Sequence, residues 1–246
     1  MAAHDPGRRD AGASRRRDTT RAAAESPHIF FIAVLSCMAG MTDAIGLIAA
    51  GNFVSFMSGN TTNLGVALAS FDAAAAGRLA LVLVLFVLGS AAGQGIAERA
   101  PRPRVAVLGV VALLLTASGS ALFLAGHGQG DTEGWRHAAR LVAVAAMGVL
   151  NAAFEKSEGQ PMGLTYVTGA LARLGQALGR YAATRQPQRP LPHLATFCGL
   201  LAGAVAGAVL QHRWPDLAAL VPAGLAWLLC LAAWSVSRRV HPSPLG

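Results

Sequence analysis

The chain has 246 residues, of which 54% are hydrophobic and only 13% are charged, and its mean hydropathy is +0.47. Because a soluble domain carries about 25% charged residues, this composition excludes an ordinary soluble domain, and the high apolar content excludes a disordered chain. The formal net charge of +8 does not indicate a nucleic-acid partner, since the basic residues flank apolar stretches and form no basic face with interleaved aromatic residues.

In chain order, a basic polar tail comes first, at residues 1–27, and we expect it to be disordered. Six apolar segments then approach the length of about 20 residues that crosses a bilayer. They are residues 29–50, 78–97, 105–125, 138–154, 193–211 and 217–236. Two further segments, 53–70 and 162–181, are more polar, and a short tail at 238–246 closes the chain. The sequence predicts an all-α polytopic membrane protein with about six transmembrane helices and two short re-entrant or broken helices.

The two weaker segments resemble each other, which indicates an internal duplication. Residues 56–68 align with 166–178 at an offset of 110, and 40–44 align with 148–152 at an offset of 108. We predict a first membrane repeat at 28–125, a periplasmic loop at 126–137 and a second repeat at 138–237. Three spans in each repeat would make the two inverted. A chance likeness between Gly- and Ala-rich helices is the alternative.

The distribution of basic residues favours six spans over eight. With six spans, 16 of the 20 Lys and Arg residues face the cytoplasm, together with both termini. With eight spans, 14 of these residues face the cytoplasm and 5 face the outside. Arg173 then lies inside a span, where an arginine costs about 2.5–3.5 kcal/mol of insertion free energy.

Asp43 is the only acidic residue deep in an apolar segment. A carboxylate there is expensive unless it is paired, protonated or hydrated, so it indicates a proton, cation or substrate site. The alternative is a structural carboxylate that caps a broken helix or bonds neighbouring backbone. Asn151 is its counterpart in the second repeat, and the two would form a polar pair near the midplane.

A run of small polar residues interrupts the 53–70 segment. We expect these residues, with the second break in the other repeat, to line a substrate or ion pathway, because paired breaks mark transporter binding sites. The pathway residues are Ser58, Gly59, Asn60, Thr61 and Asn63, with Thr168 and Gly169 in the second repeat. The alternative is a loop between tilted helices, with the hydroxyl groups bonded back to carbonyl groups.

Small-residue ridges at Gly89/Gly93 and Gly199/Gly203 permit close helix packing, either within the chain or between copies in a homo-oligomer. The sequence predicts neither a metal nor a cofactor. The histidines have no metal-ligand spacing, the three cysteines form no CxxC pair, and phosphate-loop and hydrolase motifs are missing. We therefore expect no enzyme.

Four blocks of the sequence resemble the YoaK-like family of bacterial multi-pass membrane proteins, a domain of unknown function. The blocks are residues 38–44, 57–61, 146–152 and 165–169, with Ser58 and Leu150 where the family usually has Thr and Gln. The resemblance covers about residues 30–236 and implies a bacterial inner-membrane protein, often described as a possible transporter, with no established substrate.

The leading hypothesis is a secondary transporter of an unidentified small solute, and the hypothesis includes proton coupling through Asp43 as one option. The alternative is a non-transporting membrane scaffold or sensor component. A transporter should bring Asp43, Asn60 and Asn151 together on one polar cavity, whereas a scaffold should hold Asp43 fully hydrogen-bonded in a dry core.

Overall fold

The computed structural model describes residues 29–49, 51–128, 132–152, 167–185 and 190–240. The predicted tail at 1–27 and the end of the predicted tail at 238–246 lie outside these ranges. Within them the chain is helical and contains no strand, which confirms the predicted all-α class. The helices are the first helix (Ile29–Ala49), α2 (Met57–Ala69), α3 (Ala73–Arg99), α4 (Pro103–Gly126), α5 (Thr132–Ala152), α6 (Val167–Thr184), α7 (Leu191–Arg213), α8 (Pro215–Ala218) and α9 (Leu220–Val240).

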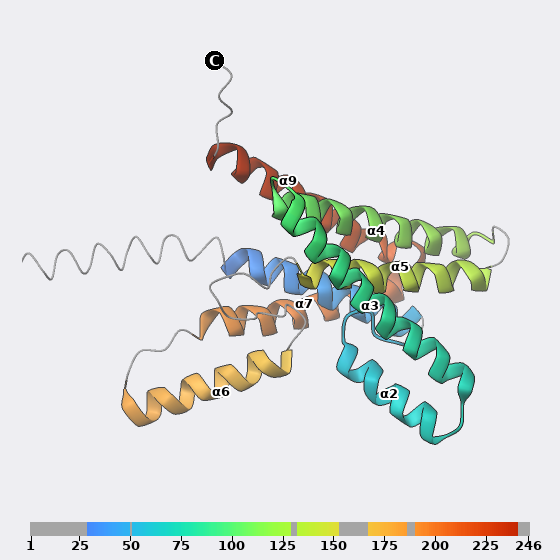
Figure 1. The fold of residues 1–246 in the computed structure, drawn as a ribbon, viewed down its shortest axis with the longest axis horizontal. Coiled ribbons are helices and arrows are strands. Elements are labelled where there is room, and N and C mark those ends of the chain that lie inside the picture. The colour runs from blue at the N-terminus through green and yellow to red at the C-terminus, as the bar shows by residue number, and fades with distance from the viewer. Residues whose placement is uncertain (1–28, 50, 129–131, 153–166, 186–189, 241–246) are drawn as a thin grey trace, which may run out of the picture.

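Five stretches of the described chain are long and apolar enough to cross a membrane: the first helix, α3, α4, α7 and the stretch Pro215–Arg238, which comprises α8 and most of α9. The 21-residue helix α5 is long enough but falls outside this set, because its first turns carry Glu133, Arg136 and Arg140. It packs between α3 and α4 (Figure 1), so much of its surface meets protein instead of lipid. Six long helices therefore lie side by side.

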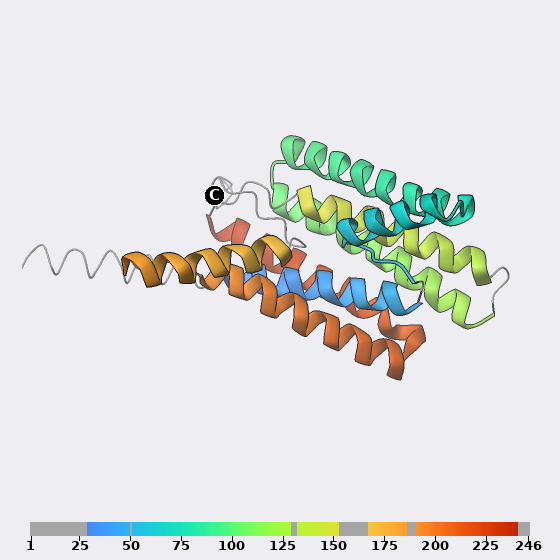
Figure 2. The same ribbon diagram turned by 90° about the horizontal axis from the view of Figure 1, so that it is seen from below.

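Neither of the two weaker segments forms one of these spans. At about 1.5 Å per residue, the 13-residue helix α2 is about 20 Å long and cannot cross a hydrocarbon core of about 30 Å. Helix α2 pairs with α3, and α6 pairs with α7, as two hairpins at different ends of the bundle (Figures 1 and 2). Helix α5 begins at Thr132, so the predicted loop at 126–137 includes its first turns.

The main core lies between the first helix, α4, α5 and α9. Its largest fully buried side chains include Leu35 and Met38 from the first helix, Leu108 from α4, and Met147 and Leu150 from α5. Many residues of α3 and α7 are exposed, including Val87 and Val205, as expected for helices that face a lipid bilayer.

Glycines bring two pairs of helices into backbone contact. A Cβ atom at Gly89 of α3 would lie 2.5 Å from the carbonyl oxygen of Ala145 in α5. Similarly, a Cβ atom at Gly203 of α7 would overlap the backbone of Cys37 in the first helix. Gly199 also faces the first helix, so these ridges serve packing within one chain. Association of two copies through the ridges stays a prediction.

The two halves of the bundle run in opposite directions. In Figure 1 the first helix, α2 and α4 run towards one end and α3 returns, whereas α5, α6 and α9 run towards the other end and α7 returns. The start of the first helix and the end of α9 lie at the same end of the bundle (Figure 1).

Candidate functional site

The Asp43 carboxylate fixes the segment that enters α2. The first helix ends near Gly51, whose positive φ of 69° turns the chain back towards the bundle. The carboxylate then accepts hydrogen bonds from the backbone N–H groups of Val54 (2.8 Å) and Ser55 (2.6 Å), and from the Ser55 hydroxyl (2.6 Å). Asp43 thus satisfies three donors of an irregular segment, which is the structural role considered in the sequence analysis.

Asn60 and Gly59 of α2 contact the same irregular segment, which precedes α2. The fully buried Asn60 donates through Nδ2 to the carbonyl oxygen of Phe53 at 2.8 Å, while its Oδ1 has no partner. Gly59 faces the rings of Phe53 and Phe56, which stack edge-to-face with centroids 5.1 Å apart. We call residues 52–56 the entry loop, because they lead into α2 and are anchored by Asp43 on one side and by Asn60 on the other.

The rest of the predicted polar run forms the start of α2. The helix begins at Met57, so the break in the chain precedes this run and does not interrupt it. Ser58, Thr61 and Asn63 are exposed, and Thr61 donates its hydroxyl hydrogen bond back to the Met57 carbonyl oxygen at 2.8 Å. Such back-bonding is the alternative role stated for these hydroxyl groups.

The residues predicted for the second repeat lie on α5 and α6. Thr168 is exposed and Gly169 is buried in the first turn of α6. Asn151 is half-buried near the end of α5. Helices α2 and α6 extend towards opposite ends of the bundle, and their N-terminal ends face each other near its middle (Figures 1 and 2).

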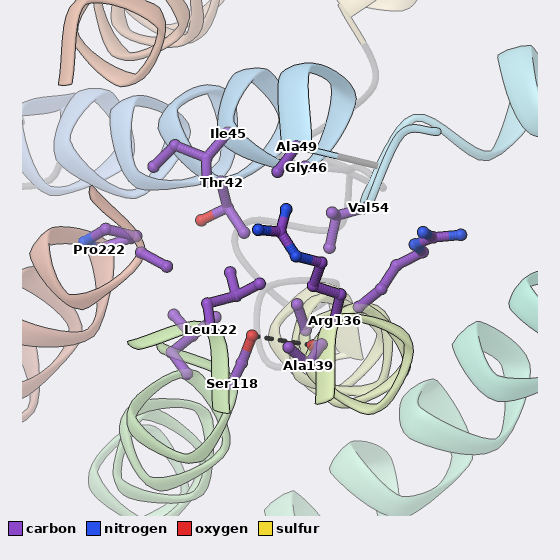
Figure 3. Close-up of a pocket in the computed structure, with 14 residues that line it drawn as sticks. Thr42, Ile45, Gly46, Ala49, Val54, Ser118, Leu122, Arg136, Ala139 and Pro222 are labelled. Carbon is purple, nitrogen blue, oxygen red and sulfur yellow. Dashed lines mark hydrogen bonds between the residues drawn. The ribbon is translucent and has the colours of Figure 1, made fainter. Parts of the chain in front are cut away.

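A small cavity lies within the bundle, next to the entry loop. This inner cavity has a volume of about 40 Å³ and is bounded by the first helix, α4, α5 and α9 (Figure 3). Its lining is mostly apolar, with Val54 of the entry loop on one side. The hydroxyl groups of Thr42 and Ser118 also line it, and each donates to a backbone carbonyl oxygen, of Met38 and Ala139 respectively.

A second, wider pocket of about 650 Å³ adjoins the inner cavity and shares Ala49, Arg136 and Arg140 with it. We call it the arginine pocket. Its residues come from the end of the first helix, the entry loop and the first turns of α3 and α5. They are Ala49, Asn52, Arg78, Thr132, Glu133, Arg136, His137 and Arg140.

None of the predicted pathway residues lines the inner cavity or the arginine pocket. Asp43 and Asn60 instead position the entry loop, whose residues Asn52 and Val54 contribute to the two pockets. From the sequence, Arg78, Arg136 and Arg140 enter only the count of basic residues on each side of the membrane. The signal that could have distinguished Arg136 and Arg140 is their four-residue spacing, which places both on one face of a helix.

Comparison with known proteins identifies the family. A family model described as "Protein of unknown function (DUF1275)" matches residues 31–233. The chain is 44% identical over 225 residues to a UPF0700 transmembrane protein of Rhizobium meliloti (strain 1021). The aligned residues cover 92% of this chain and 94% of that protein. No solved structure matches the chain. These matches confirm the resemblance to the YoaK-like proteins, and the chain belongs to the DUF1275 family of multi-pass membrane proteins.

Proposed function

We propose that this protein is a secondary transporter of a small solute in the bacterial inner membrane, built from two inverted repeats. The observation that carries the proposal is the opposite direction of the two halves in Figure 1, in which the short helices α2 and α6 also extend in opposite directions. Inverted repeats with broken helices are a recurrent transporter architecture, in which the halves exchange conformations to expose a central site to each side in turn.

The helix contacts support the repeat. The first helix crosses α7 and α5 crosses α3, and corresponding backbone positions meet at both crossings. The contacts are Gly40 with Leu200, Gly148 with Phe86, Gly203 with Cys37, and Gly89 with Ala145. By these contacts Gly89 corresponds to Gly203. The offset of 110 residues in the sequence instead pairs Gly89 with Gly199, which lies one helical turn before Gly203.

The inner cavity lies where an inverted-repeat transporter needs a binding site. The first helix and α4 belong to the first repeat, and α5 and α9 belong to the second, so both halves supply its walls. Relative motion of the halves would change the shape and access of this cavity. The arginine pocket would be its route to one side of the membrane.

Asp43 gives a route for proton coupling through the entry loop. Its carboxylate accepts all three bonds that fix Val54 and Ser55, and protonation would weaken those bonds because a neutral carboxyl is a poorer acceptor. Since Val54 lines the inner cavity, the protonation of Asp43 would release one wall of the site. In this proposal Asp43 couples indirectly and does not contact the solute.

Uptake profiling tests the proposal. Cells that lack the protein, and the same cells producing it, would be exposed to a panel of metabolites, and each protein-dependent solute would be retested with purified protein in liposomes under an imposed proton gradient. We expect at least one solute to accumulate only with the protein present, and faster when the gradient is imposed. Equal uptake of every solute with and without the protein would contradict the proposal.

One observation favours the second candidate, a membrane scaffold or sensor. The Asp43 carboxylate is fully occupied by the entry loop, as we expected for a scaffold. A scaffold needs a rigid bundle with a permanently closed cavity, whereas a transporter needs the cavity to open to both sides.

A further inference from the structure

We propose that the arginine pocket binds a small organic anion, with Arg140 as its principal contact and with the apolar part of the anion directed into the inner cavity. The inference rests on the proposed transport function for its physiological meaning, because it assigns the substrate class of that same site. The binding itself can be measured without transport.

The arginine pocket is positively charged. Three arginines line it against one carboxylate, that of Glu133. Arginine stays protonated in proteins, so the positive charge is permanent. Among the described residues, none of these three arginines forms an ion pair with a carboxylate.

The cations of the pocket come from two helices that pack against each other, α3 and α5. Arg136 and Arg140 stand four residues apart on one face of α5, a spacing at which like charges destabilise a helix. Arg78 enters from the first turns of α3, and its charge also acts on Arg140. A bound anion would offset this repulsion, for which the pocket itself supplies one carboxylate against three arginines.

Arg140 has an unused hydrogen-bond donor. Its Nε atom is buried and has no hydrogen-bond partner in the described structure. Unpaired buried donors are rare and indicate a missing ion or water. A guanidinium group presents several donors in a fixed fork that matches a carboxylate or phosphate group, so an anion would satisfy this atom.

The two pockets together indicate the shape of the ligand. Arg140 lines both pockets, whereas most of the inner cavity beyond it is apolar, with Ile45, Leu115 and Leu122 in its wall. The Thr42 and Ser118 hydroxyl groups already donate elsewhere, so they offer no further donor to an anion. An anionic head at the arginines and a compact apolar body beyond them therefore fit the two pockets together.

Membrane topology does not explain these arginines. In the six-span topology only four basic residues lie on the outer side, and three of them, Arg78, Arg136 and Arg140, line this one pocket. Basic residues that set orientation gather on the cytoplasmic side. The fourth, Arg213, lies at the end of α7 and lines neither pocket.

The test compares ligands that share one body. Binding of butyrate, butylammonium and butanol to the purified full-length protein in phosphatidylcholine nanodiscs would be measured by calorimetry and by ligand-induced thermal stabilisation. We expect butyrate alone to bind, and Arg140→Gln to weaken its binding at least tenfold. Arg213→Gln, which removes the same charge at the same end of the bundle, should leave butyrate binding unchanged.

Three results would overturn the inference. The first is equal binding of butanol or butylammonium, and the second is unchanged butyrate binding in a folded Arg140→Gln protein. The third is an effect of Arg140→Gln that appears only in nanodiscs with phosphatidylglycerol, which would assign the arginines to a lipid headgroup, or only with inorganic phosphate, which would assign them to a free inorganic anion.

Butyrate binding without any exchange across liposomes would reject transport and keep the site. Uptake of an uncharged solute without butyrate binding would reject the site and keep transport.

Discussion

The entry loop should depend on Asp43 for much of its stability. The substitution Asp43→Ala removes the acceptor of three hydrogen bonds at 2.6–2.8 Å, two of them from backbone N–H groups of the buried residues Val54 and Ser55. An unsatisfied buried donor costs about 1–3 kcal/mol, and the three are not independent, so we expect a loss of about 3–5 kcal/mol in the free energy of unfolding. Asp43→Asn keeps an acceptor for the two N–H groups but loses the charge, and should cost only about 1–2 kcal/mol.

Thermal unfolding of the purified variants in detergent measures these losses. At about 2–4 °C per kcal/mol for a chain of this size, Asp43→Ala should lower Tm by about 10 °C. The matched control is Asp72→Ala, which removes the exposed N-cap carboxylate that accepts from Ala75 N–H at 2.9 Å, and it should cost only about 1 kcal/mol. If Asp43→Ala melts within about 1 °C of the wild type, our assignment of Asp43 as the anchor of the entry loop is wrong.

Two further predictions concern the helix crossings and the second anchor of the loop. Gly203→Val should destabilise the protein by several kcal/mol or prevent folding, because the new Cβ atom meets backbone that cannot move aside, whereas Gly179→Val on the open face of α6 should unfold like the wild type. Equal melting temperatures of these two variants would refute the close crossing. Asn60→Ala should cost about 1–3 kcal/mol through the lost bond to the Phe53 carbonyl group. The exposed Asn63→Ala should cost less than about 0.5 kcal/mol, and a larger loss there than at Asn60 would contradict the packing of α2.

Much of the architecture could be predicted from the sequence, because a bilayer restricts its possibilities. A hydrocarbon core of fixed thickness requires long apolar helices, so the apolar segments correspond to the first helix, α3, α4, α7 and α9. The same reasoning separated α2 from the spans. The apolar signal for a span is weaker for α5, because a helix enclosed by other helices can carry polar residues such as Arg140 without exposing them to lipid.

The roles of single residues could not be predicted in the same way. Asp43 is prominent in the sequence because it is charged, but its partners at 54 and 55 are mainly backbone groups, and no residue type marks them. The arginine pocket joins Arg78 of α3 to two residues of α5 more than fifty positions later, and only the packing of α3 on α5 brings them together. Sequence spacing reports neighbours on one helix and says nothing of contacts between helices.

The most direct test of the account asks whether the inner cavity opens to both sides of the membrane. In a protein whose cysteines (Cys37, Cys198 and Cys230) are replaced by serine, Ser118→Cys would be exposed to a small, membrane-impermeant thiol reagent added from one side or the other. Asp72→Cys and Arg102→Cys, in turns at opposite ends of the bundle (Figure 1), are the controls and should each react from a single, different side. An inverted-repeat transporter predicts that Ser118→Cys reacts from both sides. Reaction from one side only, or from neither, would contradict alternating access and leave a static membrane bundle.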